Sequence, residues 1–235
     1  ITETMEFTRL SQDDVQFEVQ LNGNVVKNLY LGDQLIESQY YSVSEDGEII
    51  LKNSYLSGLA AGEYNIRVTY DPLGETYAAG DKPTMTSAKL VVKKADRTID
   101  YKAVDTTYDG KAYAGLTYEN RPQETVIEYK AKGAADDTYT ENVPMNAGSY
   151  TVRISTPEDA DYNAKQVSGD FTIEPKQVTI SGTTVETTKV YDGTTEARLV
   201  ETGTLSDNYD GKNLVIVAGK ASYENKNVGL DKQVT

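Results

Sequence analysis

Apolar and polar residues alternate along much of the chain, which is the pattern of β-strands with one buried face. The first such run places Val15, Phe17, Val19 and Leu21 at every second position. The same period returns in four later stretches, each bounded by Gly, Asn, Asp or Pro: 64–70, 150–154, 171–173 and 178–180. Only residues 53–59 predict a helix, a short one at the surface with a polar start and a Gly close to its end. The chain is therefore predicted to be all-β.

Two short landmarks recur at a common spacing. An Ala-Gly-x-Tyr sequence occurs at 61–64 and again 86 residues later, and a Tyr-Asp-Gly sequence occurs at 108–110 and again 83 residues later. An Asn-Ala-Gly sequence at 146–148 also returns as Asn-Val-Gly after 81 residues. A period of about 80 to 90 residues is close to the size of one immunoglobulin-like sandwich. We therefore predict tandem immunoglobulin-like antiparallel β-sandwiches in an elongated arrangement.

Two short joints divide the chain, a charged one at 90–95 and a proline-containing one at 171–176. They predict three domains: 1–95, 96–175 and 176–235. The third has fewer residues than the second and stops just after its Asn-Val-Gly landmark, so we expect it to be incomplete. Because the chain opens with Ile1 and no leader precedes it, we also expect a piece excised from a longer protein.

Composition removes several classes of function. The chain has 23 Lys and Arg residues against 37 Asp and Glu residues, a net charge of −14, and it lacks Cys, His and Trp. Thiol catalysis, thiolate metal sites and imidazole acid–base catalysis are therefore excluded. No nucleotide-binding or nucleophile-elbow motif is present, so we expect no catalytic residues and no enzyme. The negative charge disfavours nucleic-acid binding. The sequence contains no apolar run of about 18 residues, so we predict no membrane insertion of this fragment.

The landmarks themselves predict structural roles. In each Tyr-Asp-Gly, the Asp can accept a hydrogen bond from a backbone N–H two residues on, while the Gly supplies a positive φ. In each Ala-Gly-x-Tyr, the tyrosine is predicted to be a corner tyrosine whose hydroxyl reaches nearby backbone, as in sandwich domains. The turn residues are Tyr108, Asp109, Gly110, Tyr191, Asp192 and Gly193, and the corner tyrosines are Tyr64 and Tyr150.

Two residue classes leave alternatives open. The 18 tyrosines either reflect strand propensity or include exposed rings for a sugar. Acidic pairs at 13–14 and 136–137 and the acidic stretch 158–161 are either solvated loop charge or oxygen ligands for Ca²⁺. We expect no cofactor, with Ca²⁺ as the alternative. An internal isopeptide bond has no motif that identifies it.

Three stretches resemble known families. The Lys189-Val190-Tyr191-Asp192-Gly193-Thr194-Thr195 stretch, followed by residues 221–229, resembles the YDG repeat of bacterial surface proteins. Residues 108–111 together with 146–150 look like the MBG family of bacterial immunoglobulin-like repeats. Residues 41–64 look like immunoglobulin-like modules beside catalytic and carbohydrate-binding domains in secreted glycan-degrading enzymes.

These resemblances imply a non-catalytic segment of a bacterial cell-surface or secreted protein, located outside the cell. Its implied role is that of a spacer or adhesion module, with an extracellular protein or a glycan as partner. The alternative is a carbohydrate-binding accessory module of a glycan-degrading enzyme.

Overall fold

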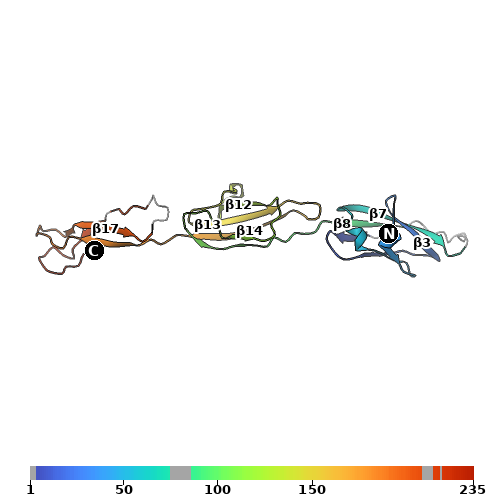
Figure 1. The fold of residues 1–235 in the computed structure, drawn as a ribbon, viewed down its shortest axis with the longest axis horizontal. Helices are drawn as coiled ribbons and strands as arrows, with labels where there is room; N and C mark the ends of the chain where they lie inside the picture. The colour runs from blue at the N-terminus through green and yellow to red at the C-terminus, as the bar shows by residue number, and fades with distance from the viewer. Residues whose placement is uncertain (1–3, 75–85, 208–213, 218) are drawn as a thin grey trace. The chain divides into compact units, whose positions relative to one another are not determined.

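The structure is a computed structural model that describes residues 4–74, 86–207, 214–217 and 219–235 (Figure 1). Strands account for nearly all of its regular structure. The helical elements are one short α-helix and two single-turn 3₁₀ helices. The prediction of an all-β fold is confirmed. No helix in the described ranges is both long and apolar enough to span a bilayer.

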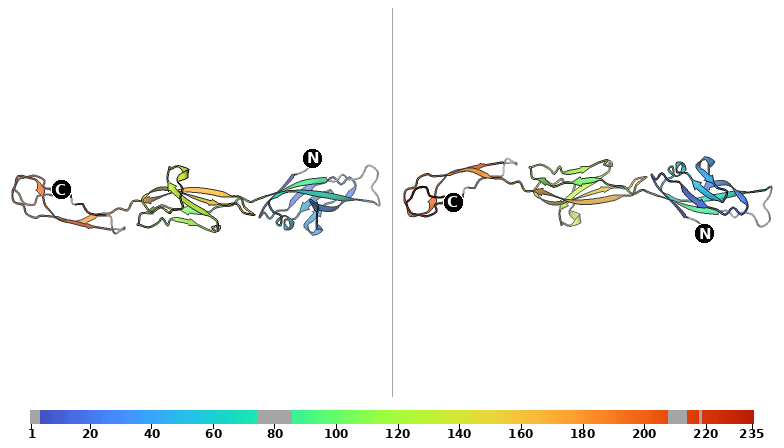
Figure 2. Two further views of the ribbon diagram at one scale, coloured as in Figure 1. Left: turned by 90° about the horizontal axis from the view of Figure 1, so that it is seen from above. Right: turned by 90° about the horizontal axis from the view of Figure 1, so that it is seen from below.

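Residues 4–74 and 86–93 form two sheets that enclose one core (Figure 2). One sheet has five strands in the order β1-β8-β7-β3-β4, and the other has three in the order β2-β6-β5. The strands are β1 (Thr4–Thr8), β2 (Val15–Glu18), β3 (Asn24–Leu31), β4 (Gln34–Ile36), β5 (Tyr41–Val43), β6 (Glu48–Leu51), β7 (Gly62–Pro72) and β8 (Thr86–Lys93). A 3₁₀ turn, η1 (Ser38–Tyr40), precedes β5.

The alternation read from the sequence fills this core. On β7, Ile66 and Val68 are fully buried, and on β2 Phe17 is 2% exposed. Burying such a side chain contributes about 1.5–3 kcal/mol each. The two sheets therefore pack as a sandwich, with the intervening residues of each strand left to the outside.

The predicted helix over 53–59 is present but shorter, as α1 (Asn53–Leu56). It is also not purely a surface element, because Leu56 is fully buried. Its first turn is held by Asp14, whose carboxylate accepts a hydrogen bond from the backbone N–H of Asn53 at 2.7 Å. A carboxylate at this end is favoured because the first N–H groups of a helix have no internal partner.

Residues 101–174, which we call the middle stretch, also form two sheets. Their orders are β10-β14-β13-β12 and β11-β9. The strands are β9 (Tyr101–Ala103), β10 (Thr106–Thr107), β11 (Leu116–Tyr118), β12 (Val126–Ala131), β13 (Gly148–Thr156) and β14 (Lys165–Glu174), with η2 (Asp136–Thr138) after β12.

Phe171 is the centre of an aromatic core in this middle stretch. Its ring stacks on Tyr113 with 3.8 Å between centroids and contacts Tyr129 edge-on and Tyr150 face-on at 6.1 and 5.6 Å. The Tyr113 hydroxyl donates to the carbonyl of Val104 at 2.9 Å. Burial raises the pKa of Tyr113 to about 12, against the lowering effect of that backbone hydrogen bond.

Residues after the second joint pair as two small sheets, β15-β17 and β16-β18. The strands are β15 (Ile180–Val185), β16 (Glu196–Ala197), β17 (Leu199–Leu205) and β18 (Ala221–Ser222). No residue described after Ile173 is buried. Ile180, expected to alternate into a core, is 53% exposed.

Two parallel pairs depart from the antiparallel arrangement that we predicted. β1 runs parallel to β8, and β10 runs parallel to β14. Each pair joins a strand at the start of a stretch to the strand at its end, so a long connection separates the two partners. The other registered pairs between named strands are antiparallel.

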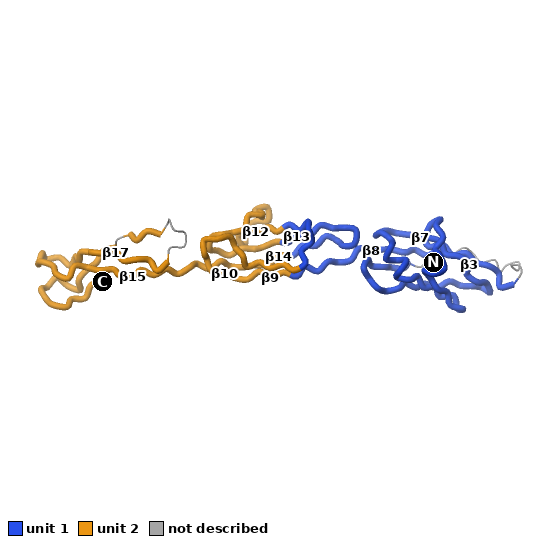
Figure 3. The backbone as a smooth tube through the Cα atoms, viewed as in Figure 1, with its two compact units in different colours: residues 1–100, 120–126, 154–167 blue, residues 101–119, 127–153, 168–235 orange. Residues whose placement is uncertain are grey.

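The chain divides into two compact units (Figure 3). The first comprises residues 1–100, 120–126 and 154–167, and the second comprises 101–119, 127–153 and 168–235. These units do not follow the sequence-based boundaries, so the division into 1–95, 96–175 and 176–235 stays a prediction.

Candidate functional site

Both Tyr-Asp-Gly sequences form tight turns. The Asp109 carboxylate accepts the backbone N–H of Lys111 at 3.0 Å, and the Asp192 carboxylate accepts that of Thr194 at 2.9 Å. The glycine that follows each aspartate has a positive φ, 74° at Gly110 and 77° at Gly193. Glycine reaches this conformation without the steric cost that a Cβ would impose.

The two turns differ in how they hold their aspartate. Lys189 forms an ion pair with Asp192 at 3.0 Å, and the Thr194 hydroxyl donates to the same carboxylate oxygen at 2.9 Å. The Thr194 N–H and these side chains lower the pKa of Asp192 to about 2. The tyrosines differ as well, because Tyr108 is half-buried while Tyr191 is 62% exposed.

Both tyrosines of the Ala-Gly-x-Tyr sequences reach backbone four residues earlier. The Tyr64 hydroxyl donates to the carbonyl of Ala60 at 2.9 Å, and the Tyr150 hydroxyl donates to the carbonyl of Asn146 at 3.0 Å. Each hydrogen bond closes the loop before a long strand, β7 or β13. Each hydroxyl is thus engaged with the backbone of its own loop.

The acidic residues singled out in the sequence are mostly engaged inside the protein. Beyond Asp14 at the helix, the pairs are Asp136 with Lys130, Glu158 with Lys94, Asp159 with Arg97 and Asp161 with Arg9. Hydrogen bonds from the backbone N–H groups of Asp161 and Tyr162, then Arg97, lower the pKa of Asp159. Within the described ranges, no three acidic side chains gather to hold a metal ion.

One aromatic ring stands apart on the outer face of the five-stranded sheet. Tyr30 on β3 follows Leu29, which is fully buried, so its side chain projects from the opposite face. The guanidinium carbon of Arg67 lies 4.2 Å from the centre of the Tyr30 ring. The other tyrosines described in residues 4–74 are either buried or packed against the core.

Tyr30 lies in a row that crosses four strands. It pairs with Leu35 on β4 and with Arg67 on β7, and Arg67 pairs with Ser87 on β8. Leu35 is 55% exposed. The ring therefore lies between the exposed aliphatic side chain of Leu35 and the planar guanidinium of Arg67. Contact with these two side chains holds the ring in one orientation.

Hydrogen-bonding side chains flank this row along the strands. Asn28 and Thr69 form the neighbouring pair on one side, and Asn65 lies two residues from Arg67 on the other. We call the surface formed by Asn28, Tyr30, Leu35, Asn65, Arg67 and Thr69 the Tyr30 face. It combines an aromatic ring with amide, hydroxyl and guanidinium groups, which is chemistry suited to a sugar.

Sequence reasoning did not identify the Tyr30 face. Tyr30 and Arg67 are 37 residues apart, and their pairing depends on a register that includes an irregularity between Val26 and Asn28. The alternation of β7 alone places Arg67 opposite the buried Ile66 and Val68, which was the one available signal.

Two segments match known families. Residues 2–86 match the family described as Carbohydrate binding domain X2, and residues 174–235 match the YDG domain. The predicted YDG resemblance is thereby confirmed, while the MBG and immunoglobulin-like assignments stay predictions. A search of curated proteins finds no match.

Among solved structures, similarity is low. A trimodular endoglucanase is 10% identical over 69% of this chain with a TM-score of 0.31, and endo-β-1,4-glucanase B from Bacillus halodurans is 10% identical over 71% with a TM-score of 0.29. This chain spans 35% and 34% of those two chains. Fibronectin(III)-like modules from Clostridium thermocellum are 14% identical over 74% of this chain and 90% of their own, with a TM-score of 0.24. The family matches are therefore similarities of two segments, residues 2–86 to a carbohydrate-binding domain and residues 174–235 to the YDG domain.

Proposed function

We propose that this chain is a non-catalytic accessory segment of an extracellular protein and that its residues 2–86 bind a polysaccharide. The observation that carries the proposal is the match of those residues to a carbohydrate-binding domain. The lack of His and Cys in the whole sequence supports a role without catalysis.

The Tyr30 face is the place where we expect the polysaccharide to bind. The Tyr30 ring and the exposed Leu35 offer apolar surface to the C–H face of a sugar ring. The amides of Asn28 and Asn65 can both donate to and accept from sugar hydroxyls. An open sheet face suits an extended chain of sugars better than a single enclosed one.

Charge favours a neutral polysaccharide. The chain carries a net charge of −14, which would repel a polyanionic glycan. The charged groups around the face are already paired, Lys27 with Asp71 at 3.0 Å and Lys89 with Glu63 at 2.8 Å. The remaining groups suit hydroxyl-rich ligands such as unsubstituted glucans, xylans or mannans.

A spacer role for the residues that follow is supported by the first joint. The backbone N–H of Ala95 donates to the carbonyl of Asp161 at 2.8 Å, and Asn163 donates to the carbonyl of Ala95 at 2.9 Å. Lys94 and Arg97 form ion pairs with the same loop. A joint bonded in this way is not a free linker, and it can present the binding segment to its target.

A glycan array with the full chain tests the proposal. We expect binding to at least one neutral polysaccharide, with affinity reduced about tenfold in Tyr30→Ala, the equivalent of about 1.4 kcal/mol. Tyr118→Ala, a half-buried tyrosine outside the Tyr30 face, is the matched control and should bind like the parent. No binding to any glycan, or equal binding by Tyr30→Ala and the parent, contradicts the proposal.

A further inference from the structure

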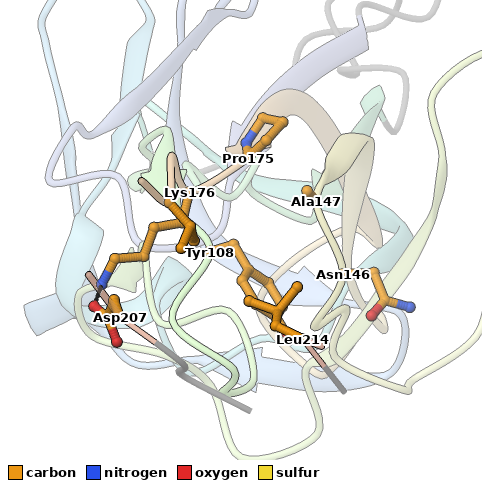
Figure 4. A pocket seen from close by; sticks show the side chains of 8 residues that line it. Tyr108, Asn146, Ala147, Pro175, Lys176, Asp207 and Leu214 are labelled. Atoms are coloured by element: carbon orange, nitrogen blue, oxygen red, sulfur yellow. Dashed lines mark hydrogen bonds and ion pairs between the residues drawn. The ribbon is translucent and has the colours of Figure 1, made fainter. Parts of the chain in front are cut away.

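The Tyr-Asp-Gly and Asn-x-Gly landmarks meet in space. Tyr108 and Asn146 of the middle stretch line one hollow of about 320 Å³ (Figure 4). Its other lining residues are Ala147, Pro175 at the second joint, and Lys176, Val178, Asp207 and Leu214 that follow. The two landmarks are 38 residues apart in the sequence. Their approach to each other was not predicted from the sequence, in which Tyr-Asp-Gly indicated a turn and Asn-x-Gly only a recurring spacing.

The same convergence occurs in the last stretch. Tyr191 and Asn227 line a second hollow, of about 690 Å³, and Tyr223 lies in the same wall. Tyr191 matches Tyr108 in the turn motif, and Asn227 matches Asn146 in the Asn-x-Gly motif. The same two residue types therefore line both hollows, although residues that follow the second joint complete the first one.

Each of these two residue pairs has hydrogen-bonding side-chain groups that are available to a ligand. In the part of the chain that the structure describes, the hydroxyls of Tyr108 and Tyr191 have no hydrogen-bond partner within the protein, and neither do the side-chain amides of Asn146 and Asn227. The hydrogen bonds of each turn are made by its aspartate and leave the tyrosine hydroxyl uncommitted. An aromatic ring beside a free amide can stack on a sugar ring and bond its hydroxyls.

The charged groups of the first hollow pair with each other, and those of the second are paired in part. Lys176 pairs with Asp207 at the first hollow, and at the second Lys189 pairs with Asp192 while Lys232 donates to Asn225. Lys226 and Asp231 also line the second hollow and form no ion pair in the described residues. The first hollow thus offers neutral donors and acceptors beside aromatic and aliphatic surface, and the second offers the same groups together with these charges.

We infer that each hollow is a binding subsite for one or two pyranose rings of a neutral glycan, with Tyr108 and Asn146 forming one subsite and Tyr191 and Asn227 the other. These subsites lie outside residues 2–86, and they add attachment points for the same or another polysaccharide. Two weak sites on one chain raise the apparent affinity for a polymer with repeated units.

The first stretch supplies an internal comparison. Its Ala60 and Ala61, which match Asn146 and Ala147, also line a hollow, but Arg9 lies there in place of a tyrosine. The N–H of Arg9 donates to the carbonyl of Lys93 at 2.7 Å, as the N–H of Tyr108 donates to that of Glu174 at 2.8 Å. Since Arg9 uses its guanidinium within the protein and Ala60 carries no amide, this position should not bind a sugar.

The test is an NMR titration of the full chain with cellohexaose, xylohexaose and mannohexaose, carried out in a Tyr30→Ala background. We expect saturable shifts of the side-chain amides of Asn146 and Asn227 with at least one hexasaccharide. Tyr108→Ala should weaken the first response at least tenfold and Tyr191→Ala the second. The milder changes Tyr108→Phe and Tyr191→Phe, which keep the ring and the fold, should weaken them about threefold each.

Tyr118→Ala serves as the control and should leave both responses unchanged. Absence of saturable shifts at both amides with all three hexasaccharides, or shifts that persist in the Tyr→Ala variants, would overturn the inference. Binding lost in Tyr30→Ala with nothing at the hollows overturns this inference and leaves the proposed function intact. Binding at the hollows in a chain whose residues 2–86 bind no glycan supports this inference and contradicts the proposed function.

Discussion

Arg9 and Asp161 are 152 residues apart in sequence and form a two-pronged ion pair. Both Nε and Nη2 of Arg9 donate to the same carboxylate oxygen, at 2.9 and 2.5 Å. The other guanidinium nitrogen donates to the carbonyls of Ser57 and Leu59. The Arg9 side chain is only 17% exposed, so this pair is less screened by solvent than an ordinary surface ion pair.

We predict that Arg9→Lys loosens the loop around Asp161. Lysine keeps the charge but lacks the planar fork that serves three acceptors at once. The loss of about 1–2 kcal/mol should accelerate amide exchange of Asn163, which bonds Ala95, by about five- to thirtyfold. Lys27→Ala breaks a pair that is about half exposed on both sides and should leave that exchange unchanged. If the Asn163 amide exchanges at the parent rate in Arg9→Lys, the ion pair does not stabilise the loop around Asp161.

The corner hydrogen bonds predict small, equal losses of stability. Tyr64→Phe and Tyr150→Phe each remove one bond from a hydroxyl to a carbonyl and keep the ring, at a cost of about 1 kcal/mol. Phe at position 150 retains its stacking on Phe171. Urea unfolding followed by tyrosine fluorescence measures the change, with Tyr118→Phe as the reference. A loss no larger than that of Tyr118→Phe would contradict a structural role for the two hydroxyls.

Gly47 should tolerate substitution far less than Gly133. Both have a positive φ, 95° and 80°, but a Cβ on Gly47 would lie 2.2 Å from the carbonyl oxygen of Val19, whereas a Cβ on Gly133 would meet open space. Gly133→Ala should cost about 1–2 kcal/mol for the backbone alone. Gly47→Ala should cost about 3 kcal/mol or more, because displacing the backbone at Val19, just after β2, adds to that. Equal melting temperatures for the two variants would refute this reading.

The turn at Asp192 predicts a defined dependence on pH. Its pKa in the folded chain is lowered to about 2, so the interaction stabilises the turn fully above the ordinary aspartate pKa of about 3.9 and is lost as the pH falls through the folded value. The amide of Thr194 should therefore stay protected at pH 4 and become exposed near pH 2. Because the Thr194 N–H is the largest contributor, Lys189→Met should raise the Asp192 pKa but leave it below its ordinary value. A carboxyl titration by NMR with an unshifted midpoint in the parent would contradict the assignment.

Local patterns in the sequence were sufficient to place the strands of the best-packed parts. The alternation at 64–70 marks β7, and that at 150–154 and 171–173 marks β13 and β14, whose inward residues are buried. The same alternation at 178–180 did not predict burial, since Ile180 needs a facing sheet to cover it and none is described there. Alternation predicts that a residue can face a core, and only packing decides that it does.

The Tyr30 face and the two hollows could not be predicted for a different reason. Each depends on residues far apart in sequence, Tyr30 with Arg67 and Tyr108 with Asn146, whose approach follows from strand register and loop paths. The landmark spacing did mark Tyr108 and Tyr191, as turn residues, and Asn146 and Asn227, as a recurring sequence with no assigned role. Their shared position in space was visible only in the fold.

The most direct test of the central claim is a binding isotherm of the full chain on an insoluble neutral polysaccharide that the array identifies. Four chains are compared: the parent, Tyr30→Ala, the Tyr108→Ala/Tyr191→Ala double variant, and Tyr118→Ala. We predict that Tyr30→Ala weakens binding about tenfold and that Tyr118→Ala binds like the parent. If Tyr30→Ala and the parent have superimposable isotherms, residues 2–86 do not bind through the Tyr30 face, and the account of this chain as a carbohydrate-binding segment loses its structural basis.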